Sequence, residues 1–166
     1  MKALIVQSHP SYESFSEAIL QVAMSSLEQS GSKVTLVRVG KGGVPLNLDL
    51  DKPDLVVFIY PTWWGGYPAS LLQWIQEFLL RNQGLLSNAQ RVISVTTHGS
   101  SKLVNSIQGE WGKIYTEREL LPLCKKGADC HWLSLYKIDR QSPEALRIFL
   151  DDISDFFLGM EIIGGY

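Results

Sequence analysis

The amino-acid sequence predicts an α/β domain in which helices cover both faces of a parallel sheet, and two observations support this prediction. Five short runs of β-branched and aliphatic residues alternate along the chain with segments whose apolar residues recur at helical spacing. In the third run, residues 54–60, the apolar stretch LVVFIY has no alternating polar position, which is typical of a strand buried on both faces. Strands that alternate with helices through right-handed crossovers form a doubly wound, three-layer domain.

The first strand leads through a loop into a helix that we expect to begin at Ser14 and to end near Gly31. Residues 14–17 fit the capping box, in which Ser14 accepts a hydrogen bond from the backbone N–H of Glu17 and Glu17 reaches back. An apolar stripe at helical spacing supports this helix. The stripe consists of Phe15, Ile19, Val22, Ala23 and Leu27.

The other elements continue the alternation. A second helix is expected to have Pro68 at its first position, and the last helix to begin at Ser142, followed by Pro143 and Glu144. Between them, residues 101–126 show a helical pattern that glycine and proline interrupt. The predicted strands are residues 2–7, 33–39, 54–60, 91–97 and 128–138.

Size and composition exclude several classes of protein. The chain has 166 residues, 45% hydrophobic and 19% charged, with a formal net charge of −2, which predicts one domain over residues 1–166 and no basic surface for nucleic acid or membranes. No apolar stretch approaches the ~20 residues that span a bilayer, and no signal-peptide layout follows Met1, so we expect a cytoplasmic protein. Cys124 and Cys130 lack the spacing and extra ligands of a zinc site, so we expect no metal and two reduced thiols.

Five strands in a domain of this size predict a flavodoxin-like three-layer α/β/α sandwich with a five-stranded parallel sheet of order 2-1-3-4-5. Ligands of such sheets bind at the carboxyl ends of the strands, beside the point where the strand order reverses. Three loops should converge there, formed by residues 8–16, 61–67 and 96–101. The candidate site therefore consists of short segments that are far apart in the sequence.

The first loop leads into a helix N-terminus, whose unpaired N–H groups and positive dipole favour an anion. His9, Ser14 and Ser16 can add side-chain donors. The loop has neither the G-x-x-x-x-G-K-[ST] pattern of NTP-binding loops nor the G-x-G-x-x-G fingerprint, which disfavours nucleotide hydrolysis and a Rossmann-type site. The alternative is an ordinary capped helix with His9 in a turn.

The second loop carries Trp63 and Trp64 next to Gly65, so two indole faces and a closely approaching backbone could wall a flat aromatic ring. Alternatively, the tryptophans pack under neighbouring loops or form a subunit contact. The third loop, residues 96–101, offers hydroxyls and backbone N–H groups, and its alternative is a plain polar turn. Together, the three loops match the phosphate, the flat ring and the polar edge of flavin mononucleotide (FMN).

These segments resemble the flavodoxin-like NAD(P)H:quinone oxidoreductases, or NAD(P)H dehydrogenases (quinone), a family that includes small bacterial relatives of DT-diaphorase. The resemblance implies a homodimeric flavoenzyme that accepts hydride from NAD(P)H and passes two electrons to a quinone-like acceptor in ping-pong order. It favours FMN over FAD, because the chain is shorter than the FAD-binding members. Three groups of segments match. The first is His9-Pro10 and residues 14–16; the second is residues 60–65, Pro68-Ala69 and residues 72–74; the third is residues 95–97 and Gly99-Ser100.

The resemblance also assigns residues to the cofactor. The implied phosphate contacts are His9, Ser14, Phe15 and Ser16; the ring contacts are Pro61, Thr62, Trp63, Trp64 and Gly65; and the polar edge faces Thr96, Thr97 and Gly99. We add His98 and Ser100 as candidate cofactor contacts, where the His98 imidazole would hydrogen-bond the ring or hinder it. Larger relatives carry a Tyr and a His after the third loop, but residues 102–109 contain neither, and His98 stands where many relatives have glycine. We take His98 and Asn105 as the candidate catalytic residues.

Two other functions fit the same pattern. A flavodoxin-type electron carrier would share the fold without a substrate pocket, although such carriers usually have acidic docking faces and this chain is nearly charge-balanced. A flavin-free regulatory or interaction protein would use the loop with Trp63 and Trp64 as a partner surface. The sequence leaves open the physiological acceptor and the choice between NADH and NADPH.

Overall fold

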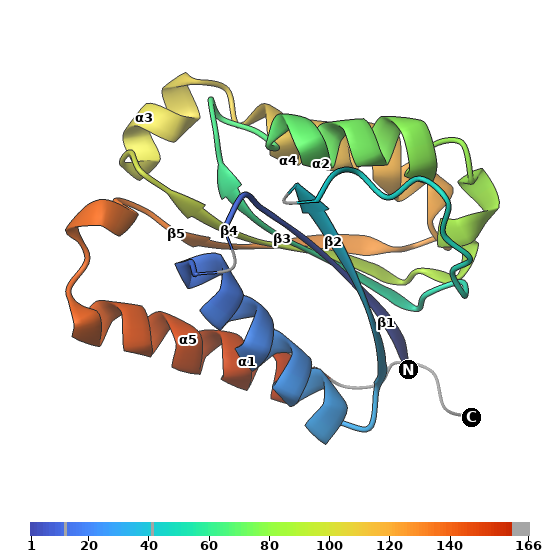
Figure 1. Cartoon of the computed structure of the whole chain (residues 1–166), viewed down its shortest axis with the longest axis horizontal. Coiled ribbons are helices and arrows are strands. Elements are labelled where there is room, and N and C mark those ends of the chain that lie inside the picture. The colour runs from blue at the N-terminus through green and yellow to red at the C-terminus, as the bar shows by residue number, and fades with distance from the viewer. Residues whose placement is uncertain (12, 41, 161–166) are drawn as a thin grey trace.

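The computed structural model describes residues 1–11, 13–40 and 42–160. Within these residues, five strands form one parallel sheet of order β2-β1-β3-β4-β5, which confirms the predicted topology (Figure 1). The strands are β1 (Lys2–His9), β2 (Lys33–Gly40), β3 (Leu55–Thr62), β4 (Arg91–His98) and β5 (Asp129–Leu135). Tyr12 of the first predicted loop and residues 161–166 of the predicted domain lie outside the described residues.

Two layers of helices cover the sheet (Figure 1). The first layer consists of α1 (Phe15–Gln29) and α5 (Pro143–Leu158), and the second of α2 (Ala69–Trp74), α3 (Lys102–Ile107) and α4 (Trp111–Tyr115). Each layer seals its own apolar core, because successive strand residues point to opposite faces: Val57 packs under the first layer and Phe58 under the second. The longest helix, α5, has 16 residues, and none of the described helices combines the length and apolar character needed to cross a bilayer.

The second layer is built from short, irregular pieces of helix. α2 runs directly into a π-helical turn at Ile75–Leu79, and α4 runs into another at Thr116–Leu120. The 3-10 turns are Gln83–Asn88, Leu121–Leu123 and, after β5, Ile138–Arg140. The interrupted pattern of residues 101–126 thus corresponds to two short helices, because Gly109 adopts a φ of 92° and turns the chain between them.

The start of α1 confirms half of the predicted capping box. Ser14 Oγ accepts a hydrogen bond from the Glu17 N–H at 3.3 Å. The expectation that Glu17 reaches back was wrong, because its carboxylate accepts from Arg38 at 2.7 and 2.8 Å and from Gln7 at 3.1 Å. The Arg38 guanidinium lowers the pKa of Glu17 to about 2. The ion pair therefore ties the first turn of α1 to β1 and β2.

Several predicted boundaries shift by a few residues. Pro68 is the N-cap of α2 rather than its first helical residue. β3 continues through Pro61 to Thr62. β5 ends at Leu135 and not at residue 138, because Lys137 adopts a left-handed φ of 54° that a strand cannot contain. The strand tips that carry the loops are therefore longer on β3 and shorter on β5 than expected.

Candidate active site

The carboxyl ends of β1, β3 and β4 bring the three predicted loops together. Pro61 pairs with Thr97 and Thr62 pairs with His98, so the second and third loops start side by side. β1 lies beside β3 and brings the first loop to the same edge of the sheet. A cavity of about 590 Å³, which we call the main cavity, lies between the loops.

Most of the predicted site residues line the main cavity. They are His9, Phe15, Ser16, Pro61, Thr62, Trp63, Trp64, Gly65, Thr97, Gly99, Ser100 and Asn105. Ser14, Thr96 and His98 do not line it. Ser14 is engaged as the cap of α1, and the fully buried Thr96 has its hydroxyl 2.6 Å from that of Thr62. These two residues therefore support the wall of the cavity from behind.

The first loop ends at the N-terminus of α1. Phe15 and Ser16 begin the helix and line the main cavity, so their backbone N–H groups lie where the helix dipole favours a negative group. His9 lines the same part of the cavity, and its Nδ1 lies 3.0 Å from the backbone nitrogen of Ser11, which holds the ring within the loop. This end of the cavity suits a phosphate.

The second loop is a tight two-residue turn. The backbones of Trp63 and Gly66 exchange hydrogen bonds of 3.2 and 3.1 Å, while Trp64 and Gly65 between them have φ values of 53° and 76°. Two successive positive φ values are typical of a type I′ turn and are unusual for tryptophan. The Trp63 side chain is 46% exposed and that of Trp64 is 89% exposed, and both line the main cavity. The indoles therefore stand at its mouth and are not sealed in the core.

α4 supports this turn from the side. The Trp111 indole N–H donates a hydrogen bond to the carbonyl of Trp64 at 3.1 Å. Trp111 also packs on Gly66 so closely that a Cβ added there would lie 1.8 Å from the indole ring. The Gly112 N–H lies 3.5 Å from the carbonyl of Gly65. The shape of the turn thus depends on glycine at position 66 and on the indole that covers it.

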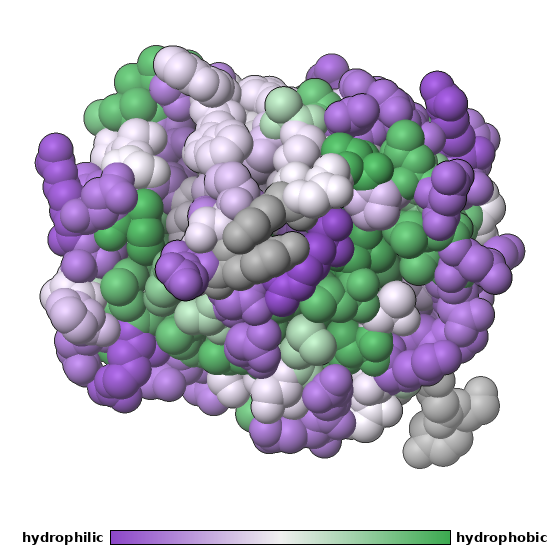
Figure 2. Space-filling model, in the orientation of Figure 1, coloured by the Kyte–Doolittle hydropathy of each residue, from purple (hydrophilic) through white to green (hydrophobic). Residues whose placement is uncertain are grey.

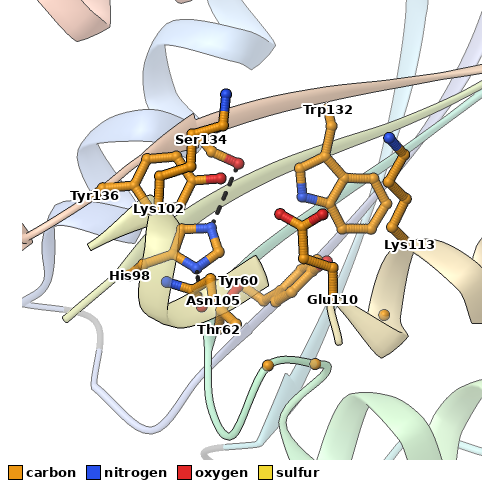
Figure 3. Close-up of a pocket in the computed structure, with 13 residues that line it drawn as sticks. Tyr60, Thr62, His98, Lys102, Asn105, Glu110, Lys113, Trp132, Ser134 and Tyr136 are labelled. Atoms are coloured by element: carbon orange, nitrogen blue, oxygen red, sulfur yellow. Dashed lines mark hydrogen bonds between the residues drawn. The ribbon is translucent and has the colours of Figure 1, made fainter. Parts of the chain in front are cut away.

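His98 is buried behind the main cavity. Its Nδ1 lies 2.9 Å from Oδ1 of Asn105 (Figure 3). The side-chain N–H of Asn105 donates to Ser100 Oγ at 2.8 Å. Nε2 lies 3.4 Å from Ser134 Oγ, and the imidazole stacks on Tyr136 with ring centroids 4.4 Å apart. Burial lowers the pKa of His98, and an amide oxygen only accepts, so the neutral ring donates from Nδ1. Hydrogen bonds therefore link His98 to Asn105 and Ser100 in the lining of the main cavity.

A second cavity of about 340 Å³ lies between α3, α4 and the ends of β3, β4 and β5 (Figure 3). Its lining residues are Tyr60, Thr62, Gly65, Gly66, His98, Lys102, Asn105, Glu110, Gly112, Lys113, Trp132, Ser134 and Tyr136. Thr62, Gly65 and Asn105 line both cavities, so they form the wall between the two. The sequence analysis did not anticipate this second cavity.

The sequence analysis also missed three residues of the main cavity, Gln108, Ile138 and Asp139. Ile138 and Asp139 follow β5, whose carboxyl end lies at the same edge of the sheet as the other strand ends. The parallel order implies a fourth loop after β5, but the predicted strand, residues 128–138, includes Ile138. Gln108 ends α3 in the segment with the interrupted pattern, where nothing in the sequence indicated its position.

Comparisons with known proteins agree with this geometry. Residues 1–117 match a family model described as a flavodoxin-like fold. A segment of 75 residues is 33% identical to NAD(P)H dehydrogenase (quinone) 1 of Rattus norvegicus, and the match covers 39% of this chain and 27% of the rat protein. The chain therefore spans about a quarter of the length of that curated relative.

Solved structures with the same fold cover nearly the whole chain. Smu.1420 from Streptococcus mutans UA159 has a TM-score of 0.80 at 19% identity, covering 96% of this chain and 100% of that one. The NAD(P)H:quinone oxidoreductase from Methanothermobacter marburgensis has a TM-score of 0.73 at 17% sequence identity, and the match covers 95% of this chain and 96% of that one. The FMN-dependent NADH-azoreductase from Bacillus anthracis, in complex with FMN, has a TM-score of 0.73 at 12% sequence identity. That match covers 94% of this chain and 97% of the azoreductase chain.

At these identities the structural likeness establishes the fold, and the family match establishes the relationship in sequence. The strand order and the cavity at the strand ends agree with both. The chain belongs to the flavodoxin-like fold family and has a homologue among the NAD(P)H dehydrogenases (quinone).

Proposed function

We propose that this protein is an FMN-dependent NAD(P)H oxidoreductase that transfers two electrons to a quinone-like acceptor. The observation that carries the proposal is one cavity bordered by a helix N-terminus, the Trp63–Gly66 turn and the loop after β4. The relatives named as quinone oxidoreductases, and the FMN-bound azoreductase of the same fold, support the chemistry. The main cavity also lies within the ~300–1,000 Å³ range of small-molecule sites.

The residues at the two ends of the main cavity fit the two ends of FMN. The N–H groups of Phe15 and Ser16, with His9, would hold the phosphate, and Ser14 would act indirectly by capping α1. Trp63 and Trp64, with the residues Pro61, Thr62 and Gly65 of the same loop, would border the ring. We favour FMN over FAD, because the azoreductase of the same fold is FMN-dependent and its structure contains FMN.

Bound FMN would supply a ring that accepts hydride from NAD(P)H and returns it to the acceptor. The protein's part is to orient the ring and to place donors where negative charge develops on reduction. Thr97, Gly99 and Ser100 line the cavity at that edge, so their backbone N–H groups would be the donors. The Ser100 hydroxyl accepts from Asn105, so its own proton would be available to the cofactor. Such preorganised donors are the main electrostatic contribution of a protein to this kind of step.

His98 and Asn105 have different roles in this proposal. Asn105 lines the main cavity and is retained as a candidate catalytic residue. His98 was expected to contact the cofactor, but it lies in the lining of the second cavity and hydrogen-bonds Asn105. We therefore treat His98 as a positioning residue that keeps the amide of Asn105, and through it Ser100, in one orientation.

We further propose that the protein is a cytoplasmic homodimer. Apolar side chains gather over α3, at the upper left of Figure 2, close to the mouth of the main cavity. The exposed fractions are 71% for Leu103, 78% for Ile107 and 89% for Trp64. Large exposed apolar patches mark interaction surfaces, and a second copy would cover this one. Sedimentation of the purified protein at two concentrations tests the dimer.

Purified protein provides the direct test of the proposed function. We expect a yellow preparation whose released pigment is FMN, and oxidation of NADH or NADPH that depends on an added simple quinone. Stopped-flow mixing with NADPH alone should bleach the flavin and thus establish the ping-pong order. A yellow protein that NADPH and NADH do not reduce would be an electron carrier, and a colourless one that ignores added FMN would contradict the proposal.

A further inference from the structure

Glu110, beside the second cavity, has an unusual conformation. Its backbone φ is 43°, in the left-handed region that residues other than glycine rarely adopt, and Gly109 before it has 92°. Glu110 occupies the N-cap position of α4, yet its side chain caps no N–H group of that helix. Helix capping therefore does not explain why a glutamate is held in this conformation. Such outliers are a reason to look for a ligand.

The Glu110 carboxylate points into the second cavity, between Trp132 and Tyr60 (Figure 3). Glu110 is half-buried, and within the described residues its carboxylate forms neither an ion pair nor a hydrogen bond. Lys102 and Lys113 also line the cavity, but both are exposed, so their ammonium groups stay hydrated. The carboxylate therefore has its full capacity to accept hydrogen bonds from a ligand.

The walls of the second cavity are flat and aromatic. Trp132 forms one side, and the stacked rings of His98 and Tyr136 lie on the other (Figure 3). Tyr60 lines the cavity with a fully buried side chain whose hydroxyl lies near that of Ser94. Burial raises the pKa of Tyr60 well above 10, so its hydroxyl keeps its proton. The volume of about 340 Å³ suits a small ring compound.

We propose that the second cavity binds a small planar aromatic compound with N–H donors on its edge, such as an aromatic carboxamide. The ring lies against Trp132, and the donors face the Glu110 carboxylate. An aromatic acid of the same shape is rejected, because it would bring a second negative charge to Glu110. Thr62, Gly65 and Asn105 line both this site and the main cavity, so the two adjoin, and the residues of this site are in place without flavin.

Benzamide and benzoate test this proposal, because they have nearly the same shape and differ in N–H donors and charge. The experiment follows the indole N–H signals of ¹⁵N-labelled protein at pH 7, with the Trp132 signal assigned from Trp132→Phe. We expect benzamide to shift the Trp132 signal, and not that of Trp64, with a dissociation constant on the order of 1 mM. Benzoate should bind about ten-fold more weakly. Equal binding of the two compounds, no binding of benzamide, or a shift at Trp64 instead would overturn the proposal.

Glu110→Gln removes the charge while keeping the size of the side chain, so it should abolish the preference for benzamide over benzoate. Glu117→Gln, at an exposed position in the π-helical turn after α4, is the matched control and should keep the preference. Preference retained in Glu110→Gln would count against the site. Should that variant fold poorly, the two-compound comparison in the wild-type protein still decides.

Added FMN should leave benzamide bound, and displacement by FMN would show that the cavities are one site.

Discussion

The two helical layers of this protein differ in regularity. On one face of the sheet, α1 has 15 residues and α5 has 16, and serines 14 and 142 cap their N-termini. On the other face, α2 and α3 have 6 residues each and α4 has 5, and π-helical turns extend α2 and α4. Long capped helices bury a continuous apolar stripe, whereas short pieces can follow an irregular cavity wall.

Backbone strain follows the same division. Trp64, Glu110 and Lys137 are the non-glycine residues with positive φ in the described part of the chain. Trp64 lines the main cavity, Glu110 lines the second, and Lys137 lies between Tyr136 of one lining and Ile138 of the other. Such conformations persist only where the surrounding packing imposes them. The regular layer therefore supplies stability, and the irregular end supplies the geometry of the site.

The largest expected effect comes from the regular layer. Phe157→Ala on α5 should lower the free energy of unfolding by about 3–5 kcal/mol, because the ring is fully buried and its loss leaves a cavity. FMN affinity of the molecules that remain folded should not change. Chemical denaturation and a flavin titration measure the two quantities. Leu158→Ala, on the same helix but 45% exposed, is the control, and weakened FMN binding in Phe157→Ala would contradict the division between the layers.

Gly66→Ala should lower both the free energy of unfolding and the affinity for FMN. Its Cβ would lie 1.8 Å from the Trp111 ring, so the turn or the indole must move, at a cost of about 1–3 kcal/mol in the free energy of unfolding. The displaced turn should also hold FMN less tightly. Gly84→Ala is the control, because nothing lies within 4 Å of a Cβ there. Identical melting temperatures and FMN affinities for the two variants would show that α4 does not support the turn.

Trp64→Ala should affect FMN and spare the fold. The side chain is 89% exposed, so we expect the free energy of unfolding to stay within about 0.5 kcal/mol of wild type. Loss of stacking on a flat ring costs about 1–3 kcal/mol, which corresponds to at least a five-fold rise in the FMN dissociation constant. Ile148→Ala, at an exposed position on α5, is the control. Unchanged FMN affinity together with a lowered melting temperature would show that Trp64 is structural.

The Glu17–Arg38 ion pair, in the first turn of α1, should make the free energy of unfolding fall at acid pH. The pKa of Glu17 is about 2 in the folded protein, against 4.5 for the free group, so the carboxylate stabilises the fold above pH 4.5 and loses this effect as the pH falls toward 2. Allowing for partial exposure, we expect about 1–2 kcal/mol. Glu17→Gln should flatten this part of the stability profile. A variant profile parallel to that of wild type between pH 4.5 and 2 would show that the pair contributes nothing.

The smallest effect is expected at His98. His98→Gly removes the hydrogen bond to Asn105, so the Ser100 hydroxyl loses its fixed orientation. We expect FMN binding to be retained and quinone turnover to fall by about five-fold, the equivalent of one ordinary hydrogen bond. His98→Gln, which can still donate to the Asn105 oxygen, should recover part of the rate. Unchanged turnover in His98→Gly would show that the network does not act on the cofactor.

Much of the fold was predictable because its signals are local. The stretch LVVFIY predicted a strand buried on both faces, and Leu55 to Tyr60 are indeed at most 1% exposed. Ser14 marked the start of α1 and Ser142 that of α5, and both side chains cap as expected. Strand order then placed the three loops at one edge of the sheet, because parallel strands all end there.

The orientation of individual side chains was harder to predict. Successive strand residues face opposite sides, so Thr97 and His98 could not both face the flavin, and the structure places Thr97 in the main cavity and His98 in the second. The partner of Glu17 could not be found in this way, because Glu17 lies on α1 and Arg38 on β2, 21 residues further along the chain.

The sequence by itself determined the order of the elements and the edge of the sheet at which the main cavity lies, since apolar periodicity and helix caps are properties of neighbouring residues. Only the tertiary structure decided that α4 supports the Trp63–Gly66 turn, that His98 hydrogen-bonds Asn105, and that a second cavity adjoins the first. These features depend on contacts between segments that are distant in the chain, and such contacts leave no local pattern.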